Sequence, residues 1–133
     1  MKTKPDAAEA AQTLKRFVSK NQLQAMTNCV NGDEGQFFID KMVEVADLFA
    51  GMPSTGETDG QGDNANAYLH YFHGNMDWYI TERDVLYDQY QAFGYANLGY
   101  GYECGYISLV ELAENDIELD LHFTPKSIGE VTC

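Results

Sequence analysis

A β-hairpin is predicted by the segment Ala67-Tyr68-Leu69-His70-Tyr71-Phe72-His73-Gly74-Asn75-Met76-Asp77-Trp78-Tyr79-Ile80-Thr81-Glu82-Arg83. Its two halves, residues 67–72 and 78–83, are rich in the aromatic and β-branched residues that favour strands. Between them, residues 73–76 contain the glycine and the asparagine that tight turns prefer. We therefore expect two antiparallel strands joined by a short turn at the centre of the fold.

The residues that follow extend the same sheet. Residues 91–98 predict a third strand, in which Gly94 weakens the middle or marks a bulge. Residues 100–105 contain two glycines and are expected to form a turn. Residues 117–123 alternate between apolar and polar side chains and predict the strand that closes an antiparallel meander.

Helices are predicted on both sides of these strands. Residues 5–19 and 22–29 favour two helices, the second capped by Asn21, and residues 34–51 favour a third and longer one. Ser108 and Glu111 match a capping box that begins a short helix ending near residue 114. The long helix has its apolar residues at i, i+4, i+7 and i+11, namely Phe38, Met42, Val45 and Phe49.

Together these elements predict an α+β fold with N-terminal helices packed on an antiparallel sheet of about four strands, and a short helix before the last strand. The chain of 133 residues fits a single domain, residues 1–133. Within it we expect a helical part (5–51), a mobile loop rich in glycine and polar residues (52–65), and a sheet part (66–124).

The totals indicate a cytoplasmic protein without a structural zinc site. No apolar run reaches the length of about 20 residues that spans a bilayer, and no apolar stretch follows Lys2 and Lys4 as it does in a secretory signal. The three cysteines, Cys29, Cys104 and Cys133, are too few and too scattered for a disulfide framework. No cofactor is expected.

Charge is the most informative total. The chain has 21 acidic and 8 basic side chains, which gives a net charge of −13. Residues 1–30 carry five bases and two acids, whereas residues 31–133 carry nineteen acids and three bases. A field of this sign repels nucleic acid and anionic membranes and speeds association with basic surfaces. The same composition also suits simple solubility, since net charge does not determine chemistry.

Two rows of acids have a regular spacing. Asp40, Glu44 and Asp47 lie on one side of the long helix, with an axial step of about 6 Å between the first two. Asp116, Glu118 and Asp120 share one face of the predicted last strand, about 6.6–6.8 Å apart. Both steps are close to two phosphate steps of about 3.4 Å along a DNA strand. The alternative is that each row is an ordinary solvated face.

Aromatic residues around the glycine-rich turn favour a protein interface. Tyr100 and Tyr102 are candidate anchors beside the acids, because tyrosines are enriched at interfaces and their rings attract cations.

A metal site is the competing prediction. Asp120 and His122 share the outer face of the last strand, and His70, Asp77 and Glu82 lie on neighbouring strands. Carboxylate and imidazole ligands could hold Mg²⁺ or Mn²⁺ for phosphodiester hydrolysis. The half of the chain that contains them has few bases with which to hold an anionic substrate.

Residues 77–84, 93–99, 105–112 and 120–123, within the span 66–123, resemble an uncharacterised family of accessory proteins carried by plasmids and phages, often near antirestriction genes. The resemblance implies a mobile element, a cytosolic setting and an action against host defence, of the antirestriction or anti-CRISPR type. It implies no catalytic residues.

These observations lead to one hypothesis and two alternatives. The hypothesis is a non-enzymatic acidic inhibitor that mimics nucleic acid and occupies a basic DNA- or RNA-binding groove in a host defence complex. It contacts that protein partner, and neither nucleic acid nor a membrane. The alternatives are a metal-dependent nuclease and a structural plasmid or phage accessory module.

Overall fold

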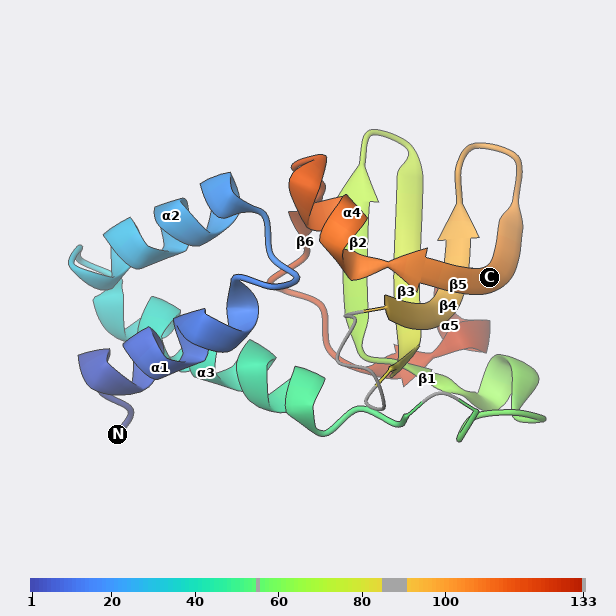
Figure 1. The fold of residues 1–133 in the computed structure, drawn as a ribbon, viewed down its shortest axis with the longest axis horizontal. Coiled ribbons are helices and arrows are strands. Elements are labelled where there is room, and N and C mark those ends of the chain that lie inside the picture. Colours follow the sequence, from blue (N-terminus) through green and yellow to red (C-terminus); the bar gives the residue numbers. More distant parts are fainter. Residues whose placement is uncertain (55, 85–90, 133) are drawn as a thin grey trace.

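The protein consists of three N-terminal helices beside an antiparallel sheet, as Figure 1 shows for a computed structural model that describes residues 1–54, 56–84 and 91–132. The helices are α1 (Lys4–Leu14), α2 (Lys20–Val30) and α3 (Gly35–Ala50). The predicted α+β class is therefore confirmed, including the short helix α4 (Leu109–Glu114) before the last strands.

The main sheet has five antiparallel strands rather than about four. In spatial order β5-β4-β3-β2-β6, these are Tyr102–Ser108, Gln91–Asn97, Met76–Arg83, Leu69–His73 and Glu118–Leu119. A second, two-stranded sheet pairs β1 (Asn66–Ala67) with β7 (Lys126–Ser127), and a 3₁₀ turn, η1 (Gly62–Asn64), precedes it. The last element of the described residues is α5 (Ile128–Thr132), which the sequence did not predict.

The first two helices differ from the prediction at their ends. α1 ends at Leu14 rather than at residue 19, and the turn that follows carries Phe17 and Val18 into the core. Burial of these two apolar side chains outweighs continuation of the helix. Ser19, and not Asn21, caps α2, because its hydroxyl accepts the N–H of Gln22 at 3.1 Å.

One core joins the helices to the sheet. Met42, Val45 and Phe49 of α3 are buried as predicted, whereas Ile39 replaces Phe38 as the first buried position. The rings of Phe17 and Phe49 stack with centroids 4.3 Å apart. The hydroxyl of Tyr71 on β2 donates to the carbonyl of Phe17 at 2.6 Å, which ties the sheet to the segment between α1 and α2.

The central hairpin is confirmed. β2 and β3 pair in register from Leu69↔Ile80 to His73↔Met76, and the turn contains Gly74 with φ of 59°. The predicted bulge lies opposite Gly94: Ile80 pairs with Gly94 and Glu82 with Phe93, so the extra residue is Thr81 of β3. A Cβ at Gly94 would lie 2.0 Å from the carbonyl oxygen of Tyr79, so close approach of two strands requires glycine there.

One turn prediction and one strand prediction in the C-terminal half are wrong. Residues 100–105 were expected to form a turn, but β5 begins at Tyr102, and Gly99 and Gly101 supply the positive φ angles of the preceding turn. The predicted strand 117–123 is reduced to the two residues of β6, because the chain turns after Asp120.

The predicted loop 52–65 is tied to the sheet by a buried carboxylate. Glu82 is only 2% exposed. Its Oε1 accepts the N–H of Gly56 at 2.8 Å, and its Oε2 accepts the N–H of Thr58 at 3.0 Å and the Thr58 hydroxyl. A buried carboxylate is tolerated when donors surround it, so Glu82 and this loop stabilise each other.

We predict that Glu82→Ala lowers the free energy of unfolding by about 3 kcal/mol, because two backbone N–H groups lose their acceptor in a buried site. Urea denaturation measures this change. Asp59→Ala is the matched control, since it removes an exposed acid from the same loop, and it should change stability by no more than about 0.5 kcal/mol. Equal losses in the two variants would contradict the proposed anchor.

Candidate functional site

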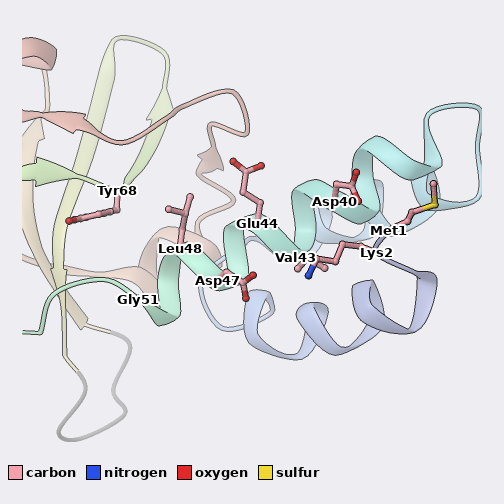
Figure 2. A pocket seen from close by; sticks show the side chains of 9 residues that line it. All are labelled: Met1, Lys2, Asp40, Val43, Glu44, Asp47, Leu48, Gly51 and Tyr68. Carbon is pink, nitrogen blue, oxygen red and sulfur yellow. The ribbon is translucent and has the colours of Figure 1, made fainter.

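The predicted acidic row on α3 lies beside an open groove. Asp40, Glu44 and Asp47 are exposed on the side of the helix away from the core. The groove has a volume of about 770 Å³ and extends along α3 to Tyr68, which precedes β2 (Figure 2). Its lining residues are Met1, Lys2, Asp40, Val43, Glu44, Asp47, Leu48, Gly51 and Tyr68. The site therefore combines three carboxylates and the side chain of Lys2 with apolar side chains.

The three carboxylates of this row differ in how they are held. Glu44 pairs with Lys41, with Oε2 and Nζ 3.0 Å apart. Asp40 Oδ1 accepts from the amide of Gln36 at 2.8 Å. The carboxylate of Asp47 has no hydrogen bond or ion pair with any residue that the structure describes. Neither Asp40 nor Asp47 forms an ion pair with a lysine or arginine of the described ranges, although Lys2 lines the same groove.

The second predicted row does not form an acidic ladder. Only Glu118 of its three members lies in β6, while Asp116 precedes the strand and Asp120 follows it. Asp116 and Glu118 line a separate groove of about 450 Å³ beside α2. That groove and the α3 groove share no lining residue. The structure therefore does not bring the two rows together in one groove.

Asp116 serves the fold. Its φ of 57° is a left-handed conformation, which aspartate adopts more readily than most residues. Hydrogen bonds from the side chains of Ser19 and Asn21 hold the pKa of the Asp116 carboxyl below its usual range. The bond from Asn21 Nδ2 measures 3.2 Å and joins the start of α2 to the turn after α4.

Asp120 is held against a histidine. Nδ1 of His70 lies 2.9 Å from Asp120 Oδ2, and its Nε2 lies 2.7 Å from Asp77 Oδ1. The imidazole stacks on Tyr79, with ring centroids 4.4 Å apart and planes at 9°. Both nitrogens of the imidazole thus face a carboxylate oxygen. Asp120 therefore has an internal partner.

Of the alternative metal ligands, Asp120 lies against His70, which also contacts Asp77, whereas His122 meets Asp120 only through its backbone N–H. The second oxygen of Asp120 accepts the backbone N–H of His122 at 3.0 Å, so both of its oxygens are engaged. Glu82 lies under the loop at residues 56–58. Across the described part of the chain, no group of three or more histidine, cysteine, aspartate or glutamate residues is placed to hold a metal ion.

The two candidate tyrosine anchors have different environments. Tyr100 is 95% exposed at the turn between β4 and β5. Tyr102 is half-buried, and its ring centroid lies 6.1 Å from that of Tyr79. Burial, together with Tyr102 and nearby acids, raises the pKa of Tyr79 to about 12. Only Tyr100 is placed to contact a partner without rearrangement.

Sequence reasoning missed two groups of residues. Tyr68 closes the end of the α3 groove, but no spacing rule relates it to a helix more than fifteen residues earlier. Leu98 and Tyr106 are 53% and 73% exposed on the β4–β5 hairpin. The glycines that alternate with tyrosines over residues 99–106 were the available signal for that hairpin, but the whole segment 100–105 was predicted to be a turn.

Comparisons of the chain with protein-family models, curated proteins and solved structures find no match. None of the helices in the described ranges combines the length and the apolar character needed to cross a bilayer.

We predict that Asn21→Ala moves the pKa of Asp116 upward, towards the ordinary aspartate value, because one of its two donors is lost. NMR titration of the carboxyl carbons measures this shift. Because the pKa of Asp116 is lower in the folded state than in the unfolded state, this carboxylate also makes stability depend on pH. Its contribution to the free energy of unfolding is complete above the unfolded pKa of 3.8 and is lost as the pH falls through the folded pKa. An unchanged Asp116 titration in the variant would contradict this assignment.

Proposed function

We propose that the protein acts without catalysis, as an acidic inhibitor that occupies the basic nucleic-acid-binding groove of a host defence complex. The α3 groove is the contact surface. Asp40 and Asp47 stand in for phosphates, Glu44 contributes a partly neutralised charge, and Val43, Leu48 and Tyr68 provide apolar contact to the stems of lysine and arginine side chains.

One observation carries this proposal: Asp40 and Asp47 form no ion pair with a lysine or arginine of the described ranges, and the carboxylate of Glu44 pairs only with Lys41 of the same helix. Carboxylates without an internal cation attract external ones, and the attraction acts over about 8 Å at physiological ionic strength.

The bases of the acidic half are engaged in the fold. Arg83 donates from Nη2 to the carbonyl of Ala50 at the end of α3 at 2.8 Å, and its guanidinium lies 5.1 Å from the centroid of the Phe49 ring. Lys126 lies 5.8 Å from the centroid of Phe123. Residues 31–133 therefore supply few cations for holding DNA or RNA, and their acids are suited to a basic protein partner.

The acids of the second predicted row do not belong to the proposed contact surface. Asp116 and Asp120 are held by Asn21 and His70, so these carboxylates support the fold rather than serving as phosphate surrogates. Glu118 is exposed but isolated on its two-residue strand. The proposal therefore rests on α3, with Tyr100 as a separate, distant candidate contact.

We predict that the protein displaces labelled DNA from a restriction or CRISPR-type complex in a gel-shift competition, and that displacement weakens as salt is raised. The double variant Asp40→Lys and Asp47→Lys should weaken displacement by about tenfold or more, since two attractive contacts become repulsive.

The matched control reverses two exposed acids elsewhere, Asp59→Lys and Glu114→Lys, and has the same net charge as the α3 variant. It should compete nearly as well as the unmodified protein. Equal weakening by both double variants would show that only net charge matters and would reject the α3 groove. Displacement that does not depend on salt would reject the electrostatic basis of the proposal.

A further inference from the structure

Only one of the two edges of the five-stranded sheet is covered by another described part of the chain. At the β6 edge, the side-chain amide of Gln22 donates to the carbonyl of Leu119 at 2.7 Å and accepts its N–H at 2.8 Å. At the other edge, β5 pairs with β4 alone, and no described residue forms a backbone hydrogen bond with its outer side. The unpaired N–H and C=O groups of an uncovered edge strand can bind another strand. Proteins usually prevent this pairing with charged side chains, with proline or with a segment that covers the edge.

The β5 edge lacks these devices. Between Gln91 and Val110 the only charged side chain is Glu103, in a chain of net charge −13, and the segment contains no proline. Three large side chains on this hairpin are exposed: Tyr100 (95%), Tyr106 (73%) and Leu98 (53%). The hairpin is therefore a place where two copies of this acidic chain can approach with little repulsion.

A glycine in the middle of β5 is not explained by the chain itself. A Cβ added at Gly105 would meet no atom within 4 Å, and its φ is not positive. Gly94, which is its partner in β4, is required by contact with Tyr79. Glycine within a strand costs about 0.5–1 kcal/mol relative to alanine, and it often marks a point where another backbone approaches closely.

We propose that β5 pairs in antiparallel orientation with β5 of a second copy of this chain, about a two-fold axis that passes beside Gly105. In this register Gly105 faces its own copy, Cys104 faces Tyr106, and Glu103 faces Ile107. The two Glu103 residues are then four positions apart, about 13–14 Å, which exceeds the screening length of about 8 Å at physiological salt.

The assembly closes on itself. Because the β6 edge is already satisfied by Gln22, each copy offers one edge, and pairing produces a symmetric dimer rather than a filament. Figure 1 shows α3 and β5 on opposite sides of the molecule. The dimer therefore leaves both α3 grooves open, and its formation does not depend on the function proposed for them.

The test is the oligomeric state of the full chain, measured by sedimentation equilibrium under reducing conditions from about 1 μM to about 1 mM, the range of small, weak interfaces. We expect the unmodified protein to reach twice its mass of 14.9 kDa. Gly105→Glu should weaken dimerisation by at least about tenfold, because like charges meet at the axis. Thr124→Glu adds the same charge at an exposed site outside the sheet edge and should leave dimerisation unchanged.

A second variant tests the register without relying on repulsion. Gly105→Cys in a Cys104→Ser background should form an intermolecular disulfide under mild oxidation, because residues that face each other across antiparallel strands have Cα atoms about 4.5–5.5 Å apart. A protein that remains monomeric throughout this range would overturn the proposal and leave the edge to a strand of another protein. Dimers that persist in Gly105→Glu and show no Gly105→Cys crosslink would also overturn it.

Discussion

The junction between Tyr71 and Phe17 is the interaction on which the arrangement of this protein depends. Tyr71 is fully buried, and burial raises the pKa of its hydroxyl well above the usual value, so the hydroxyl stays protonated and donates to the Phe17 carbonyl. Phe17 in turn stacks on Phe49 of α3. The central strand β2, the turn after α1 and the end of α3 are thereby held in one core, which places Tyr68 beside the acidic side of α3.

The acids of the chain divide into two groups by what surrounds them. Glu82 and Asp116 accept hydrogen bonds from a loop and from α2, Asp120 contacts the ring of His70, and all three stabilise the fold. Asp40 and Asp47 face solvent in a groove that also contains apolar side chains and Lys2, and neither forms an ion pair with a described lysine or arginine. This division matters for function, because a carboxylate already satisfied within the protein gains less from an external cation.

The two edges of the sheet also differ in whether the chain satisfies their backbone hydrogen bonds. Gln22 supplies at β6 the donor and the acceptor that a neighbouring strand would supply, although it belongs to a helix. β5 has no such cover among the described residues, and its side chains are almost without charge. A strongly acidic chain therefore carries one surface suited to cations, on α3, and one suited to a neutral strand, on β5.

Local patterns were sufficient for the α3 helix, the β2–β3 hairpin and the Ser108 cap, because helix periodicity, turn residues and caps depend on neighbours only a few residues apart. The exposed positions of Asp40, Glu44 and Asp47 follow from the same periodicity. Four features depended on contacts between distant segments: the end of α1 at Leu14, the short β6, the anchoring of Glu82 by residues 56–58, and the pairing of Asp120 with His70. Alternation along residues 116–123 placed Asp120 on the outer face but could not show that a histidine fifty residues earlier lies opposite. Periodicity predicts on which face of a helix or strand a side chain lies, because it depends only on local geometry. The partner of that side chain is determined by how the helices and strands pack against one another.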